Sequence, residues 1–399
     1  MSHSVPGPLD GVRIVDLTRL LPGAYATLLM ADLGADVVKI EAPHGGDPAR
    51  AMPPVAGGTS AFFQLLNRNK RSVTLDLRSA EAGAVLDTLL SRADVVVDSF
   101  RPQTARRLGV DAQTLRARHP RLVHGSITGF GHTGPYIGRA AHDINYEALA
   151  GLLDVGGRPD EPPGVPRTLM ADIGAAMHAA AGILAALFQR ERTGRGAAVD
   201  VAIHEAALSW LLCPGVRQLV PGTHADARDL PLHGRDACYN IYRTADDRYV
   251  ALGALEAKFW TAFCARIGRP DLAAQHDAQG DQRTRVLADV RAIMRTRTRD
   301  AWLGLFADLD VCLTPVNTPA EALGDPHIAA RGATSRHGGS TYITTPIAVT
   351  QTPTGDGWNA ARHVDVRPAP ALGAHTDEVL GDVGLTAEAI ARLRDRGTI

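Results

Sequence analysis

A histidine and an aspartate are placed in this chain so that they could exchange protons with one substrate carbon. His142 lies in the segment AHDINY at residues 141–146, and Asp172 lies in LMADIG at residues 169–174. Histidine titrates near neutral pH without help, and burial can raise the pKa of an aspartate toward the same range. Two such groups on opposite sides of one carbon could remove a proton and return one. The pair therefore predicts chemistry of the racemase or epimerase type.

The elements that must position this pair follow an alternating pattern. Residues 12–17 and 36–41 predict buried strands on either side of a helix at 22–34, which makes a βαβ unit with a right-handed crossover. The same alternation continues along the chain, with further strands expected at 72–77, 94–99 and 122–127 and further helices at 80–93 and 172–190. We therefore expect an α/β fold with a doubly wound, mostly parallel sheet.

The pattern changes after about residue 215, which predicts a second, smaller α+β domain. Residues 239–253 read as a hairpin, and helical segments follow to about residue 309. The chain is irregular near 40–60 and 330–370, where it could wrap another subunit or cover a ligand, and it ends in an amphipathic helix at 387–396. We expect a large domain at 1–215 and 328–399, a linker at 216–236 and a small domain at 237–327.

Composition excludes several classes of protein. The 42 Lys+Arg residues nearly balance the 43 Asp+Glu residues, and aromatic residues are only 5%, which argues against nucleic-acid binding. No signal peptide and no apolar run of membrane-spanning length is evident, so we expect a cytoplasmic protein without a membrane partner. The four cysteines show no metal-binding spacing and predict reduced thiols; they are Cys213, Cys238, Cys264 and Cys312.

Common cofactor and hydrolase motifs are absent. The first βαβ unit suggests a dinucleotide site with Glu41 as the ribose-binding acid, but the turn TRLLPG at residues 18–23 has one glycine and no G-x-G-x-x-G. The sequence also lacks the P-loop, H-E-x-x-H and G-x-S-x-G patterns. We expect neither a metal nor a redox cofactor.

Basic side chains near the predicted strand ends are candidates for binding a phosphorylated ligand. A ligand with a pyrophosphate and a 3′-phosphate would need several such donors, whereas the alternative is a solvated charged rim. The glycine-dense loop at 129–135 could bring its backbone close to a ligand, or it could be a plain turn. The basic candidates are Arg19, Lys39, Arg68, Lys70, Arg71 and Arg101.

The acidic candidates also have structural alternatives. Asp172 precedes an Ala-rich helix, where it could be the N-cap; the same helix start would offer N–H groups to an oxyanion. His142 could be a structural histidine. Glu256 follows a predicted strand and could be a carboxylate at a helix start.

Five segments resemble family III CoA-transferases, also called the CaiB/BaiF family. They are PLDGVRIVDL at 8–17, ADLGADVVKIE at 31–41, NRNKRS at 67–72, SITGFG at 126–131 and PALGAHT at 370–376. The resemblance implies a homodimer of interlocked chains and an acyl-CoA substrate, with coenzyme A as part of the substrate thioester. The residues implied for CoA binding are Arg19, Lys39, Asn69, Lys70, Arg71, Leu75, Arg101, Gly129 and Tyr146.

Within this family the chain is most similar to the α-methylacyl-CoA racemases. The transferases use the aspartate matching Asp172 as a nucleophile, whereas the racemases use it as an acid/base. In the racemases the segment matching HDINY supplies the histidine base, His142, and a glutamate matching Glu256 supports it. The chain departs from the family at Ala141 and at residues 175–176, where glycine is frequent, which implies a tighter pocket.

We therefore predict epimerisation at C2 of 2-methylacyl-CoA thioesters through an enolate. His142 and Asp172 are the two proton-transfer groups, and backbone N–H groups near Asp172 stabilise the enolate. Glu256 and Asp143 orient His142. The alternatives are a CoA-transferase with Asp172 as its nucleophile and a catalytically silent protein that binds CoA esters.

Overall fold

The computed structural model describes residues 7–56, 58–156, 162–215, 220, 231–349 and 366–399. The chain divides into two compact units. Unit 1 comprises Met1–Leu153, Val165–Leu211 and Pro326–Ile399, and unit 2 comprises Asp154–Gly164 and Leu212–Asp325. Most of the linker predicted at 216–236 lies outside the described residues.

Unit 1 contains a six-stranded sheet in which all described strand pairs are parallel. The sequence predicted all of its strands except β8, whose alternate residues are only half buried and give a weak pattern. The strand order is β5-β2-β1-β6-β7-β8. The strands are β1 (Arg13–Asp16), β2 (Asp36–Glu41), β5 (Lys70–Thr74), β6 (Val95–Asp98), β7 (Val123–Thr128) and β8 (Ala198–Ala202).

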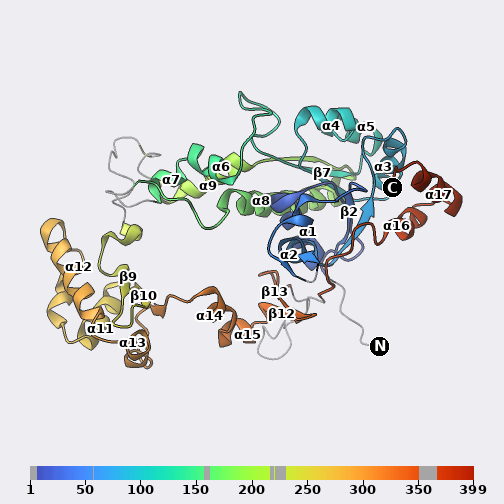
Figure 1. Ribbon diagram of the computed structural model, residues 1–399. Coiled ribbons are helices and arrows are strands. Elements are labelled where there is room, and N and C mark those ends of the chain that lie inside the picture. Colours follow the sequence, from blue (N-terminus) through green and yellow to red (C-terminus); the bar gives the residue numbers. More distant parts are fainter. Residues whose placement is uncertain (1–6, 57, 157–161, 216–219, 221–230, 350–365) are drawn as a thin grey trace. The chain divides into compact units, whose positions relative to one another are not determined.

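Helices cover both faces of this sheet, which confirms a mixed α/β fold (Figure 1). One face packs against α1 (Leu20–Asp32), α6 (Asp143–Leu149), α8 (Met170–Thr193) and α9 (Ile203–Ser209). The other packs against α3 (Ala82–Leu90), α4 (Pro102–Leu108), α5 (Ala112–Arg118), α16 (Thr376–Asp382) and α17 (Ala387–Asp395). Apolar strand residues alternate between the two cores: Ile14 packs under α1 and α8, and Val15 under α3.

The order of the strands reverses between β1 and β6. Chain segments leaving the carboxyl ends of these two strands diverge to opposite sides of the sheet, and ligands of open α/β sheets bind in the crevice this creates. Arg19 follows β1 and Arg101 follows β6. The fold therefore places two of the predicted basic residues beside the expected ligand crevice.

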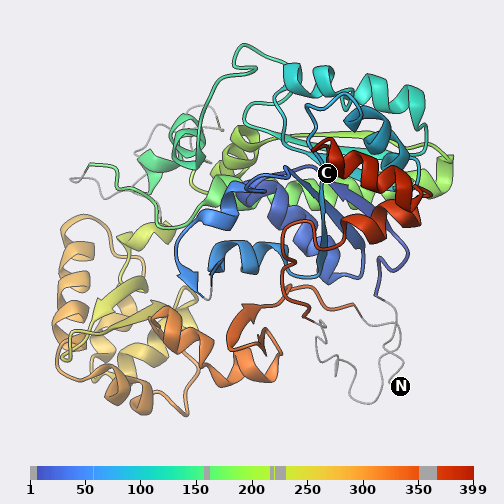
Figure 2. The same cartoon turned by 45° about the vertical axis from the view of Figure 1, so that its right-hand side comes forward.

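The C-terminal tail covers the exposed edge of β5, as the red segment in Figure 2 shows. The amide of Ser72 donates to His375 Nδ1 at 3.2 Å, and the amide of Thr74 donates to the Thr376 hydroxyl at 3.0 Å. Paired in this way, the edge strand offers fewer free hydrogen-bonding groups to another chain. Two segments that carried the family resemblance, residues 67–72 and 370–376, are thus neighbours.

Shorter elements complete unit 1. The stretch near 40–60, where no periodicity was found, holds a 3₁₀ helix and a two-residue hairpin that precede α2 (Ala61–Asn67); these are η1 (Pro48–Ala51), β3 (Val55–Ala56) and β4 (Thr59–Ser60). The segment near 330–370 contains α15 (Pro326–Ala330), β12 (Thr334–His337) and β13 (Ser340–Ile343), although residues 350–365 lie outside the described part. Helix α7 (Leu152–Val155) and η2 (Trp210–Leu212) lie at the boundary between the units.

Unit 2 is built on a three-stranded antiparallel sheet, in the order β11-β10-β9. The hairpin of β9 (Tyr239–Arg243) and β10 (Tyr249–Gly253) was predicted, whereas β11 (Leu313–Pro315) was too short to detect. Trp260, Phe263 and Trp302 fill the core. The helical elements are α11 (Ala257–Arg266), η4 (Pro270–Gln275), α12 (Gly280–Met294), α13 (Arg299–Leu305) and α14 (Pro319–Leu323), and Pro231–Arg235 forms a turn before β9.

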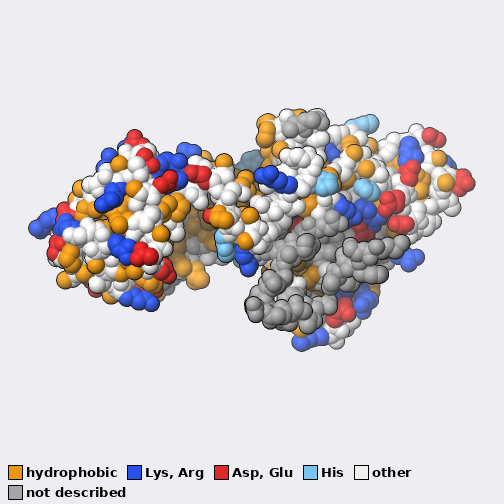
Figure 3. All heavy atoms as spheres, turned by 90° about the horizontal axis from the view of Figure 1, so that it is seen from below, with side chains coloured by type: hydrophobic (Ala, Val, Ile, Leu, Met, Phe, Trp, Pro, Cys, Tyr) orange, Lys and Arg blue, Asp and Glu red, His pale blue; other side chains and the backbone are white. Residues whose placement is uncertain are grey.

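The charges on unit 2 are mixed. On the face seen in Figure 3, basic and acidic side chains are interspersed among hydrophobic ones, in keeping with a formal net charge of −1 for the whole chain. That face therefore offers no continuous basic surface of the kind that tracks a nucleic-acid backbone.

Helix α8 is the one helix in the described residues that is long and apolar enough to cross a membrane. This corrects the expectation that no apolar run reaches that length. Half of its most apolar stretch is buried, with Ala175, Ala179 and Ile183 packed in the core of unit 1. A helix that packs in the core of an α/β sheet passes the same test of length and composition.

Candidate active site

His142 is the residue at which α6 begins. Its backbone is extended, and its N–H group donates to Asn145 Oδ1 at 3.0 Å, which closes the first turn of the helix. The imidazole is exposed. The contacts of the first turn fix where His142 lies, and its exposed ring can meet a substrate.

Asp172 is the third residue of α8, so the prediction that it is the N-cap was wrong. The N-cap is Leu169, whose side chain has no acceptor atom for the free N–H groups of the helix start. Two carboxylates from α6 serve instead: Asp143 Oδ1 accepts the Asp172 N–H at 2.9 Å, and Glu147 Oε1 accepts the Met170 N–H at 3.2 Å.

This capping corrects two further expectations. Asp143 does not hydrogen-bond to His142 among the described residues, because its carboxylate is engaged at the start of α8. Backbone N–H groups near Asp172 were expected to stabilise an enolate, but those of Met170 and Asp172 already donate to carboxylates. What the two contacts do is join α6 to α8, and so join the helix that begins at His142 to the helix that carries Asp172.

The environment of Asp172 favours its protonated form. Burial, followed by the nearby carboxylates of Asp143 and Glu147, raises the pKa of Asp172 to about 7. Burial and a hydrogen bond with Asp143 likewise raise the pKa of Glu147 to about 7. At neutral pH Asp172 therefore exists in both protonation states, as a group that accepts and donates protons requires.

Tyr146 lies near Asp172 and belongs to a group of packed aromatic side chains. Phe130, in the loop after β7, packs edge-on against Tyr136 and Tyr146, with ring centroids 5.4 and 5.3 Å apart. Gly129 allows this packing, because a Cβ there would lie 2.4 Å from the Tyr146 hydroxyl. Burial, and then the negative charge of Asp172, raises the pKa of Tyr146 to about 12, so the phenol stays protonated.

Apart from Tyr146, the predicted CoA-binding residues divide into three groups, of which the first lies at the carboxyl ends of the strands. Arg19, Leu75, Arg101 and Gly129 follow β1, β5, β6 and β7. Both arginines are exposed, with no ion-pair partner among the described residues. The Leu75 side chain is only 1% exposed, so it belongs to the core.

The second group is buried in unit 1. Lys39 forms an ion pair with Asp47 at 2.9 Å and donates to the Thr18 carbonyl, while Lys70 pairs with Asp16 at 3.2 Å. Burial alone would raise the pKa of Asp16, but Lys70 and Lys39 outweigh it and hold that pKa at about 2. Both lysines are buried and paired with internal carboxylates rather than exposed on a solvated rim, and they anchor the loop that carries Arg19.

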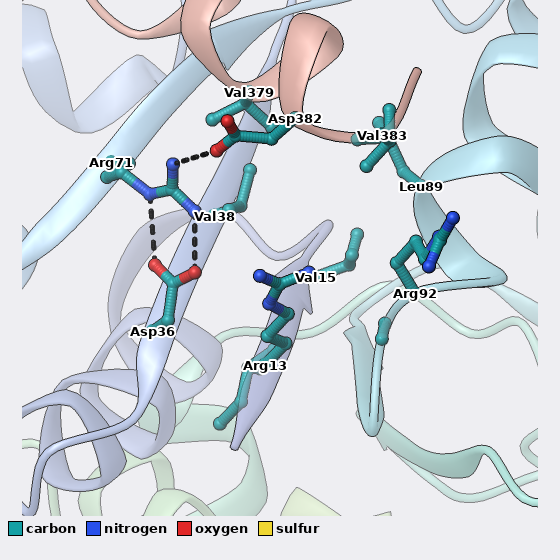
Figure 4. Close-up of a pocket in the computed structure, with 12 residues that line it drawn as sticks. Arg13, Val15, Asp36, Val38, Arg71, Leu89, Arg92, Val379, Asp382 and Val383 are labelled. Atoms are coloured by element: carbon teal, nitrogen blue, oxygen red, sulfur yellow. Dashed lines mark hydrogen bonds and ion pairs between the residues drawn. The ribbon is translucent and has the colours of Figure 1, made fainter. Parts of the chain in front are cut away.

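The third group lies at the amino end of β5. Arg71 pairs with Asp36 at 2.5 Å and with Asp382 at 3.6 Å, and Figure 4 shows these contacts in a small pocket. Asn69, one residue before β5, donates to Asp32 and accepts the Arg367 N–H at 2.8 Å. Both side chains therefore tie segments of unit 1 together.

The pocket in Figure 4 is distant from Asp172. Arg13 begins β1, and its N–H donates to Asp94, which also binds Arg190 near the end of α8. An α-helix rises 1.5 Å per residue, so Arg190 lies about 27 Å along α8 from Asp172. This pocket is not part of the candidate active site.

Glu256 belongs to unit 2, whereas His142 and Asp172 belong to unit 1. It is the residue at which α11 begins, its side chain is exposed, and it makes no side-chain cap. Its support of His142 stays a prediction that follows from the family resemblance.

Sequence reasoning missed Glu147. Its signal was available, because Asp143 and Glu147 are four residues apart and lie on one face of a helix. Two acids at that spacing repel each other unless they share a proton or bind the same partner. A partner at the start of α8 could not be inferred from α6 alone.

Comparisons with known proteins show what this chain is similar to. A model of CoA-transferase family III matches residues 9–376. The human alpha-methylacyl-CoA racemase is 31% identical over 390 residues, covering 96% of both chains. A succinyl-CoA–D-citramalate CoA-transferase from Chloroflexus aurantiacus is 33% identical over 410 residues, covering 100% of both. The crystal structure of a CAIB/BAIF family protein from Brucella suis matches with a TM-score of 0.82 and 30% identity, covering 95% of this chain and 100% of that chain.

Proposed function

Because the chain belongs to CoA-transferase family III, we propose that it epimerises C2 of 2-methylacyl-CoA thioesters. His142 removes the C2 proton from one epimer, and the electron pair of the broken C–H bond moves into the thioester as an enolate. Asp172, protonated, delivers its proton to the opposite face of C2. His142 is left protonated and Asp172 ionised, and the opposite epimer reacts with the roles exchanged.

One observation carries this proposal: the pKa of Asp172 is raised to about 7 at a helix start that Asp143, the residue after His142, contacts directly. A nucleophilic carboxylate works in its ionised form alone, whereas a two-base racemase uses its carboxyl group in both protonation states. The environment of Asp172 matches the second requirement better. This is why we prefer the racemase to the CoA-transferase activity that other relatives carry in their names.

The remaining groups support binding and orientation. Arg19 and Arg101, exposed beside the ligand crevice, are proposed to bind the phosphates of coenzyme A. Glu256 is proposed to stabilise the protonated form of His142, as the resemblance to racemases implies.

The test is proton NMR of the protein with one epimer of a 2-methylacyl-CoA in D₂O, without any acceptor acid. We expect deuterium at C2 together with formation of the other epimer. If C2 keeps its proton while CoA moves to an acid added afterwards, the protein is a transferase with Asp172 as its nucleophile. If neither reaction occurs but the ester binds, the protein only binds CoA esters.

We also propose the predicted interlocked homodimer. Several apolar side chains of α8 are exposed in unit 1, among them Met177 at 50% and Phe188 at 61%, and a second copy of the chain would cover such residues. Sedimentation equilibrium should therefore give twice the 42.3 kDa mass of the chain. A single-chain mass at micromolar concentration would contradict the dimer.

A further inference from the structure

Helix α6 carries two buried carboxyl groups on the face that meets α8. Asp143 is 6% exposed and Glu147 is 3% exposed, one helical turn apart. They hydrogen-bond to each other, and together they accept N–H groups from the start of α8. Two carboxyl groups can hydrogen-bond to each other only if one of them holds a proton.

Among the described residues, neither Asp143 nor Glu147 forms an ion pair with lysine or arginine. The other charged or titratable side chains on α6, on α9, near the start of α8 and in the adjoining loops include Tyr146, His142, Asp172, His178, His204, Glu205, Arg101, Arg139 and Arg167. His178 Nδ1 hydrogen-bonds to the Gly174 carbonyl of its own helix, and the positive charge of Arg101 lowers the pKa of Tyr146. The largest influences on the pKa of Glu147 are therefore burial and Asp143, which raise it, while the backbone N–H groups of Met170 and Ala171 lower it.

We propose that Glu147 is a positioning residue that shares a proton with Asp143 and thereby sets both the place and the ionisation of Asp172. Glu147 and Asp143 hold the first turn of α8, from which the Asp172 side chain projects. The carboxyl pair also determines how much negative charge Asp172 meets. The inference rests on the proposed function of Asp172 as an acid/base, but the interaction itself does not depend on that function.

The electrostatics of the cluster agree with this role. After burial, the charges of Asp143 and Glu147 are the causes that raise the pKa of Asp172. Burial and Asp143 raise the pKa of Glu147 to about 7 as well. Removing the charge of Glu147 should therefore make Asp172 easier to ionise.

Glu147→Gln is the variant that isolates this effect. The glutamine carbonyl can still accept the Met170 N–H, and its amide can still donate to Asp143, so the capping contacts remain. We expect the pKa of Asp172 to fall by roughly one pH unit, because one nearby negative charge is lost in a partly buried site. The acidic limb of the pH profile of C2 exchange should move by the same amount.

The readout that does not require activity is ¹³C NMR of protein labelled at the aspartate carboxyl carbon, with the Asp172 signal assigned by its loss in Asp172→Asn. Glu205→Gln is the matched control, since it removes a carboxylate that is exposed on the neighbouring helix α9. We expect this control to leave the titration of Asp172 where it is in the natural sequence.

The outcomes separate the two proposals. If Glu147→Gln lowers activity at every pH without moving the Asp172 titration, Glu147 is only structural and the inference is overturned. If the NMR titration moves but no C2 exchange occurs in any variant, the coupling stands and the racemase function fails. If Glu205→Gln lowers the pKa of Asp172 as much as Glu147→Gln does, the effect comes from net charge and not from the contact with α8. That result also overturns the inference.

Discussion

Asp172→Asn is expected to abolish interconversion of the two epimers while the CoA thioester still binds. Asparagine keeps the shape of the side chain, and the backbone N–H of residue 172 can still donate to Asp143. It cannot transfer a proton, and a positioned acid/base contributes roughly 10²- to 10⁴-fold to the rate. The measurement is the rate of epimer formation by chiral chromatography, together with the dissociation constant of the substrate.

The same variant should be more stable than the natural chain at neutral pH. The folded-state pKa of Asp172 is raised from 3.8 to about 7, so its stabilising contribution is complete below about pH 4 and is lost as the pH rises to about 7. Asparagine has no such loss. Between about pH 4 and pH 7, the free energy of unfolding of Asp172→Asn should rise relative to that of the natural chain by up to roughly 4 kcal/mol, at about 1.4 kcal/mol per pH unit. Loss of activity combined with a less stable protein would instead indicate damage to the fold.

His142→Gln is expected to have a comparable effect on epimer interconversion, with a distinct pattern of isotope exchange. Asp172 would still face one side of C2, so it could remove and return a proton on that side alone. The variant should therefore exchange C2 hydrogen with D₂O in one epimer and not form the other. The rate of interconversion should fall by roughly 10²- to 10⁴-fold.

Asp172→Asn provides the reciprocal control for this experiment. With His142 intact, it should exchange the C2 hydrogen of the opposite epimer. If His142→Gln instead exchanges both epimers at the natural rate, His142 is not one of the two bases. If the protein transfers CoA between acids and His142→Gln keeps that activity in full, the transferase alternative is supported.

Much of unit 1 could be predicted from the chain. The strands of the first βαβ unit are continuous apolar runs, and Ile14 and Val37 have no exposed surface in the structure. The His142/Asp172 pair was also identified, because residue types with suitable chemistry stood at recognisable segments. Predictions based on charge alone were weaker: Lys39 and Lys70 were expected to bind a phosphorylated ligand but are bound to internal carboxylates.

The sequence by itself determined the elements, since local periodicity and apolar runs are properties of neighbouring residues. It also determined the chemical identity of the proton-transfer groups. Only the tertiary structure decided which charges meet. Glu147 reaches Met170 across 23 positions of the chain, and Arg71 reaches Asp382 across more than 300, because packing of helices on a sheet joins residues that share no local pattern. Burial decided the rest: a carboxyl group removed from water beside two other carboxylates titrates near pH 7, and no spacing in the sequence encodes that.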